Sequence, residues 1–296
     1  MKKISFITED NIKLDGLLYK SEIVSNGVVI SIHGMTSNCF KRRDDIFANE
    51  YIKNNISYFC FNNRGHDLTA FVDKYIDNKR TGVILGTSFE DALDSYYDIT
   101  GAIKAMTDIG YEKIHLQGHS MGSIKIVYAY NKLKIENNTS VLNKISSVIL
   151  LSLIDIVGIQ KYSLKDKFDS ILEYALEKEK DNKSNELMPK NAFLHPMSVK
   201  SYLRYFKHNE KIDFVKFSDE NYDFEEFNNI TVPIFMRWGN DNEMILQDVN
   251  KLVKLMNSKI NNIHKNIGYI DGANHNYDEK ELVLANEIIS FLKTYN

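Results

Sequence analysis

The chain of 296 residues is 43% hydrophobic and 26% charged, and its 37 Lys and Arg against 40 Asp and Glu leave a formal net charge of −3. This composition excludes wholesale disorder and argues against a nucleic-acid partner, because nucleic-acid binders usually carry a basic excess. The two cysteines, Cys39 and Cys60, are too few for a disulfide scaffold, so we expect free thiols and a cytoplasmic protein. No uncharged apolar run approaches about 18 residues, and the sequence therefore predicts no membrane span.

Strand and helix patterns alternate through the first half of the chain. Apolar residues on both sides of the turn-like cluster Glu9-Asp10-Asn11 predict an N-terminal hairpin. The elements expected next are strand 27–32, helix 44–54, strand 56–61, helix 88–108, strand 114–117, helix 120–133 and strand 145–153. Such an alternation predicts βαβ crossovers and a mostly parallel sheet.

The alternation stops after residue 155 and resumes near residue 230. Residues 156–229 contain highly charged, helix-like stretches, and they are too many for an ordinary connection between a strand and a helix. Strand 231–238, helix 246–256, strand 263–270 and helix 279–295 follow. We therefore predict a core made of residues 1–155 and 230–296, interrupted by a helical cap at 156–229.

The segment Gly118-His119-Ser120-Met121-Gly122 has the pattern of a nucleophile elbow. It follows a predicted strand and opens a predicted helix, which is the context that a G-x-S-x-G elbow requires. Glycines on both sides of Ser120 lack a Cβ, so the strand and the helix can approach each other closely around a tight turn. We predict Ser120 as a catalytic nucleophile.

A nucleophilic serine needs a histidine as its base, and in this elbow type the histidine is the last member of the triad in the chain. The histidines downstream of Ser120 are His195, His208, His264 and His275. The first two lie in the insertion, and His264 begins a strand, at the wrong edge of the sheet. His275 lies in a loop just after strand 263–270, where it can reach the carboxyl edge. It is the predicted base.

The acid of the triad is expected after the preceding strand, which ends in Gly239-Asn240-Asp241-Asn242-Glu243. We predict Asp241, because Gly239 permits a turn and Asp241 follows two residues later. Glu243 is the alternative, since a glutamate can serve in the same role. The oxyanion donors are predicted to be the backbone N–H groups of Met121, directly after the nucleophile, and of Met35, in the loop after the first central strand.

The order of these motifs resembles that of α/β-hydrolase fold proteins. The matching residues are His33-Gly34, Asn63-Arg64-Gly65-His66, Gly118–Gly122, Gly239-Asn240-Asp241 and Gly272-Ala273-Asn274-His275. The turn after strand 56–61 and the helix that follows it also resemble a branch that includes siderophore esterases. The resemblance implies an α/β fold with a mostly parallel eight-stranded sheet flanked by helices, a helical cap, a Ser-His-acid triad, and no cofactor or metal.

These features predict a cytoplasmic serine hydrolase that acts on a small-molecule ester through an acyl-enzyme. A thioesterase, amidase, peptidase or acyltransferase would use the same triad, because the triad does not encode the leaving group or the acceptor. The fold can also serve a ligand-binding protein with little turnover. The natural substrate and the oligomeric state stay open at this point.

Overall fold

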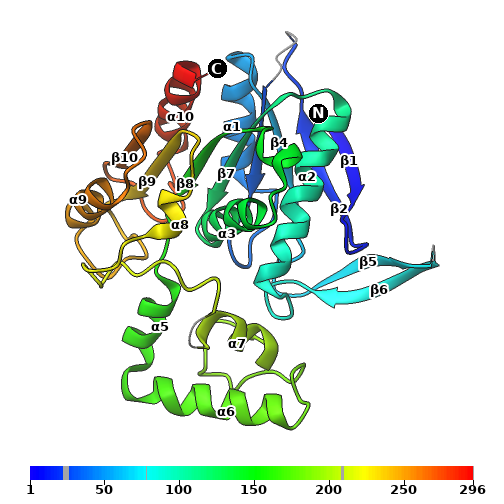
Figure 1. Cartoon of the computed structure of the whole chain (residues 1–296), viewed down its shortest axis with the longest axis vertical. Helices are drawn as coiled ribbons and strands as arrows, with labels where there is room; N and C mark the ends of the chain where they lie inside the picture. Colours follow the sequence, from blue (N-terminus) through cyan, green and yellow to red (C-terminus); the bar gives the residue numbers. More distant parts are fainter. Residues whose placement is uncertain (23–26, 78, 208–209, 296) are drawn as a thin grey trace.

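A computed structural model describes residues 1–22, 27–77, 79–207 and 210–295 (Figure 1). His208 lies outside the described residues. Within that part of the chain, eight strands form one sheet in the order β1-β2-β4-β3-β7-β8-β9-β10. The strands are β1 Lys2–Ile7, β2 Lys13–Tyr19, β3 Gly27–Ile32, β4 Ser57–Phe61, β7 Lys113–His119, β8 Ile145–Leu151, β9 Ile234–Gly239 and β10 Lys265–Ile270.

The sheet is parallel from β4 to β10, and the N-terminal hairpin of β1 and β2 joins its edge in the antiparallel sense. The predicted fold class is therefore confirmed: a mostly parallel sheet flanked by helices. The central strands are almost entirely buried because helices cover both of their faces, which accounts for their largely apolar sequences.

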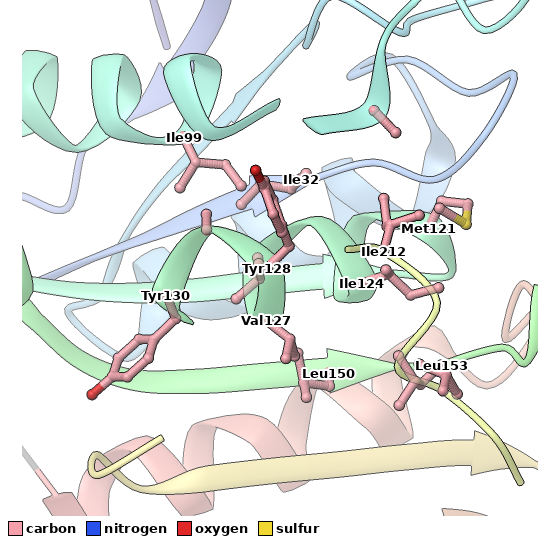
Figure 2. Packing of buried hydrophobic residues seen from close by; sticks show 14 of the residues in the cluster. Ile32, Ile99, Met121, Ile124, Val127, Tyr128, Tyr130, Leu150, Leu153 and Ile212 are labelled. Atoms are coloured by element: carbon pink, nitrogen blue, oxygen red, sulfur yellow. The ribbon is translucent and has the colours of Figure 1, made fainter. Parts of the chain in front are cut away.

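Helices lie on both faces of the sheet, and alternate residues along each strand pack against them. The helices are α1 Arg42–Lys53, α2 Ser95–Ile109, α3 Met121–Ile135, α4 Thr139–Leu142, α9 Val249–Lys259 and α10 Glu281–Tyr295, with a short 3-10 turn, η1, at Ala92–Asp94. Val29 belongs to the cluster that contains α1 and α10, whereas its neighbours Val28 and Ile30 belong to the cluster that contains α2, α3 and α9. Figure 2 shows Ile124 and Val127 of α3 in this second core.

One hairpin was not predicted. Strands β5 Ala70–Ile76 and β6 Lys79–Leu85 pair with each other and project from the body of the molecule (Figure 1). Most of their side chains are exposed or half-buried, so the sequence carries no burial alternation there. Helix α2 also begins later than the predicted residue 88, because the backbone of Thr87 and Ser88 bonds to Asp67 and Leu68 instead of entering a helix.

The segment between β8 and β9 carries four helices and a 3-10 turn among its described residues: α5 Ile156–Leu164, η2 Lys165–Lys167, α6 Phe168–Lys180, α7 Val199–Phe206 and α8 Glu225–Asn228. Helices α5, α6 and α7 stand apart from the sheet (Figure 1). We call the described residues of 156–229 the cap segment. Because β8 ends at Leu151, shortly before residue 156, the segment begins near the carboxyl edge of the parallel strands.

The stretch just before α2 holds the cap segment against the core. Ser198 N–H donates to the Ser88 carbonyl, and the Ser201 hydroxyl donates to the Glu90 carbonyl, each at 2.7 Å. The Arg204 guanidinium bonds both carboxylate oxygens of Asp91, at 2.6 and 2.7 Å. Residues 86–91 are not helical, and their carbonyl and carboxylate groups therefore accept the bonds that hold α7.

Candidate active site

Ser120 occupies a strained turn between β7 and α3. Its backbone lies at φ 55° and ψ −122°, a conformation that non-glycine residues rarely adopt. A Cβ on Gly122 would lie 2.1 Å from the Ile32 carbonyl oxygen, and one on Gly118 would lie 2.5 Å from the Gly122 carbonyl carbon. Both glycines are therefore required for the strand and the helix to meet here, as the motif predicts for an elbow.

His275 follows β10 in a loop, and its Nδ1 is hydrogen-bonded to the Glu243 carboxylate. Asp241 does not make this contact; its side chain is exposed and its Oδ1 accepts a bond from Asn242. The structure thus brings the alternative acid, Glu243, and not the preferred Asp241, to the imidazole of His275. The reason is the path of the loop: the Asp241 N–H donates to the Ala273 carbonyl at 2.9 Å, and the chain then folds the Glu243 side chain back under Gly239.

The Glu243 carboxylate is buried and surrounded by donors. Oε2 accepts from the Gly239 N–H at 2.8 Å and from the Ser152 hydroxyl at 2.7 Å, and Oε1 accepts from the Met244 N–H at 2.9 Å as well as from His275. Burial by itself would raise the pKa of this carboxyl. The bonds from His275, Gly239 and Ser152 outweigh it, so the pKa is lowered and the group is held as a carboxylate.

Ser152 bonds the Glu243 carboxylate, and Tyr277 in turn bonds Ser152. Neither residue was identified from the sequence. Ser152, directly after β8, is fully buried at φ 45°, and its hydroxyl also lies within hydrogen-bonding distance of the Tyr277 hydroxyl and the His275 carbonyl. The Tyr277 hydroxyl donates to the Arg237 carbonyl at 2.7 Å. A polar residue directly after the apolar run 148–151 is the signal that could have marked Ser152.

Two buried histidines beside the site are held neutral. His119 Nε2 donates to the His275 carbonyl at 2.7 Å, which fixes the loop that carries the imidazole. Burial, followed by the charges of Arg43 and His275, lowers the pKa of His119 well below its usual value. Burial also lowers the pKa of His33 to about 3. Its Nδ1 donates to the Gly34 carbonyl at 2.9 Å and its Nε2 accepts from the Asn63 N–H at 3.2 Å.

The loop after β3 lies directly against the nucleophile. A Cβ on Gly34 would lie 3.0 Å from the Ser120 Cβ. Further along, Thr36 has φ 56°, and its N–H donates to the Thr87 hydroxyl at 2.7 Å, which fixes the loop that contains Met35. The N–H of Met121 is the first in α3, where backbone N–H groups have no acceptor within the helix. Both predicted oxyanion donors therefore belong to segments that adjoin Ser120.

Ser120 and His275 line one cavity of about 310 Å³. Apolar side chains form much of its wall. Four of them belong to the cap segment, namely Ile156, Ile159, Phe193 and Leu194, and the others are Met35, Ile154 and Met244. His195 contributes a polar group to the same wall, and its buried Nδ1 has no hydrogen-bond partner among the described residues. A larger hollow of about 680 Å³ beside β1 and α2 contains none of the predicted site residues.

Within the described part of the chain, no group of three or more His, Cys, Asp or Glu side chains is arranged to hold a metal ion. The same residues include no helix of the length and apolar character needed to cross a membrane.

Comparison of whole structures shows an α/β-hydrolase fold. The esterase Est1E from Butyrivibrio proteoclasticus, solved with ferulic acid bound, superposes with a TM-score of 0.66 at 16% identity, covering 98% of both chains. The Pyrococcus furiosus esterase Pf2001 gives a TM-score of 0.59 at 16% identity, covering 99% of this chain and 92% of its own. A thermostable carboxyl esterase from Bacillus coagulans gives 0.67 at 12% identity, with 99% and 98% covered.

The chain belongs to the family described as "Protein of unknown function (DUF1749)", which matches residues 91–293. No curated protein matches the sequence significantly.

Proposed function

We propose that this protein is a serine hydrolase that cleaves carboxylic esters of small molecules with Ser120, His275 and Glu243 as its triad. The observation that carries the proposal is the buried bond between His275 Nδ1 and Glu243, made beside a cavity that Ser120 also lines. A carboxylate at Nδ1 keeps the other ring nitrogen, Nε2, free to accept a proton from a serine.

The reaction follows from these positions. Ser120 Oγ attacks the ester carbonyl and transfers its proton to His275 Nε2, while Glu243 stabilises the imidazolium that forms. The N–H groups of Met35 and Met121 donate to the oxyanion of the tetrahedral intermediate. When this intermediate collapses, His275 returns the proton to the leaving alcohol and an acyl-enzyme remains. Water, deprotonated by His275, then releases the acid and regenerates Ser120.

The cap segment is proposed to cover the site and select the acyl group. Its apolar side chains, with Ile156 and Phe193 among them, line the cavity next to Ser120. A mostly apolar cavity of about 310 Å³ suits an acyl group of short to medium length. Two buried free thiols, Cys39 and Cys60, support a location in the reducing cytoplasm.

The test is hydrolysis of 4-nitrophenyl esters from acetate to dodecanoate by the wild type, Ser120→Ala and Ser37→Ala. Ser37 is a matched control because it is a serine of the same cavity wall outside the proposed triad. We expect Ser120→Ala to lose at least about 10³-fold in kcat, and Ser37→Ala to lose little. A fluorophosphonate probe should label Ser120 in the wild type, as read by mass spectrometry of its peptides. Turnover that persists in Ser120→Ala would refute the proposal.

A further inference from the structure

A second cavity adjoins the active-site cavity. Its volume is about 400 Å³, and it shares Met35, Thr36, Ser37 and Asn276 with the cavity that contains Ser120. The shared residues are the loop that carries a proposed oxyanion donor and the residue directly after the proposed base. The two cavities therefore adjoin each other along this loop, next to the residues proposed to react.

The outer wall of this second cavity is basic. Lys41, Arg42 and Arg43 line it, together with the acids Asp278 and Glu281. Arg42 and Glu281 pair with each other at 3.6 Å. Because Arg42 is paired, Lys41 and Arg43 are the two cations of this wall whose role is still to be accounted for.

Neither Lys41 nor Arg43 forms an ion pair with an acidic side chain of the described residues. The Arg43 guanidinium donates to the Asn276 carbonyl at 3.3 Å. The neighbouring Asp44 is buried, and its carboxylate accepts bonds from the Tyr58 and Ser31 hydroxyls. The Asp278 carboxylate accepts from the neutral Asn274 amide and so keeps its negative charge. Three cations against two acids leave this wall with a net charge of +1 for a ligand.

The stability of α1 does not account for these cations. Lys41 is its N-cap residue, without a side-chain capping bond, and Arg42 and Arg43 begin the helix. Basic side chains at a helix N-terminus oppose the helix dipole and are mildly destabilising there. Their position in the wall of a cavity that adjoins the active-site cavity is therefore not explained by the helix.

The proposed reaction indicates which part of an ester would reach this cavity, namely the leaving alcohol. His275 must protonate the leaving alcohol, so the leaving group departs beside His275, which lines the apolar cavity. Asn276, the next residue, lines both cavities, so the far end of a leaving group can extend past it into the second cavity while the apolar wall takes the acyl group. We propose that the second cavity binds an anionic group, a carboxylate or a phosphate, on the leaving-group half of the ester. Arg43 and Lys41 would hold it, since guanidinium and ammonium groups both bind such oxyanions. This inference rests on the proposed esterase function.

The test compares matched esters that differ in the charge of the leaving group. 4-(Butanoyloxy)benzoate and the neutral 4-(butanoyloxy)benzamide share an acyl group and contain one cleavable ester each, and 4-(butanoyloxy)phenyl phosphate supplies the other anion. We expect the wild type to hydrolyse at least one anionic ester with a higher kcat/KM than the benzamide, mainly through a lower KM. The preferred anion identifies the leaving-group chemistry. Added salt should reduce the preference, because the wall is partly exposed.

Variants assign the preference to the wall. Lys41→Gln combined with Arg43→Gln should lower the ratio of anionic to neutral kcat/KM by about 5-fold to 10-fold, as expected for two partly exposed contacts. Arg43→Lys should keep most of the ratio, because it keeps the charge. Lys53→Gln, at the far end of α1, is the control and should leave the ratio unchanged.

The outcomes separate the two proposals. A wild type that hydrolyses all three esters without preferring an anion, or a ratio that Lys41→Gln and Arg43→Gln do not change, refutes the anion site and leaves the esterase proposal standing. No hydrolysis of any ester, together with no labelling of Ser120, refutes the esterase proposal and the anion site with it.

Discussion

The contact between Glu243 and His275 leads to a direct prediction about which acid matters. We compare Glu243→Gln with Asp241→Asn, since both changes replace a carboxylate by its amide at nearly constant size. The four hydrogen-bond partners of the Glu243 carboxylate among the described residues are all donors: His275, Ser152 and the N–H groups of Gly239 and Met244. An amide has one oxygen for these four donors, so it leaves two of them without an acceptor.

The magnitude follows from the charge that the change removes. Two unit charges about 4 Å apart interact by about 4 kcal/mol at the effective dielectric constant of about 20 that suits protein sites. If Glu243 stabilises the imidazolium of His275 by that amount in the transition state, its loss lowers kcat by about 10³-fold. Asp241 is exposed, and among the described residues its side chain bonds only Asn242, so Asp241→Asn should change kcat by less than about twofold.

The assay is the steady-state hydrolysis of 4-nitrophenyl butyrate, with the thermal midpoint of each variant measured to separate catalysis from folding. The expected result is a large loss of kcat in Glu243→Gln at a nearly unchanged KM, and near wild-type values in Asp241→Asn. A large loss in Asp241→Asn together with an active, folded Glu243→Gln would refute the assignment of the acid.

Three further predictions concern stability. Gly122→Ala should lower the free energy of unfolding by about 1 to 3 kcal/mol or more, because its Cβ would lie 2.1 Å from the Ile32 carbonyl oxygen. The measurement is the thermal midpoint, and a midpoint within about 1 °C of the wild type would contradict the steric argument. Lys125 and Glu90 form a buried ion pair at 2.7 Å, so Lys125→Met leaves the Glu90 carboxylate buried without its cation and should lower the free energy of unfolding in urea by about 3 to 5 kcal/mol. Adding Glu90→Gln should recover part of this loss. If the effects of the two substitutions simply add, the two side chains are not coupled and the reasoning fails. The pKa of Glu243 is lower in the folded state than its ordinary value of 4.5, so its contribution to stability is complete above that value and is lost as the pH falls through the folded pKa. The difference in the free energy of unfolding between the wild type and Glu243→Gln should therefore shrink toward low pH. A difference that grows toward low pH would contradict the lowered pKa.

The periodic parts of the fold were predictable because they depend on local pattern. Apolar runs such as 28–30 and 148–151 indicate strands buried on both faces, and the structure contains them within β3 and β8. The β5–β6 hairpin was not predictable in this way. Its side chains are largely exposed, so no alternation of polar and apolar residues marks it in the sequence.

The sequence by itself determined the strand–turn–helix geometry around Ser120, because two glycines and a helix start are local features. It also located His275 in a loop after a strand at the carboxyl edge. Only the tertiary structure decided which acid meets the imidazole, because Glu243 and His275 lie 32 residues apart and the backbone bond from Asp241 to Ala273 sets the path of the loop. The bond from Ser152 to Glu243 and the cavity beside Lys41 also depend on the tertiary structure. Each of them brings together segments that are far apart in the chain, and no local sequence pattern predicts that they meet.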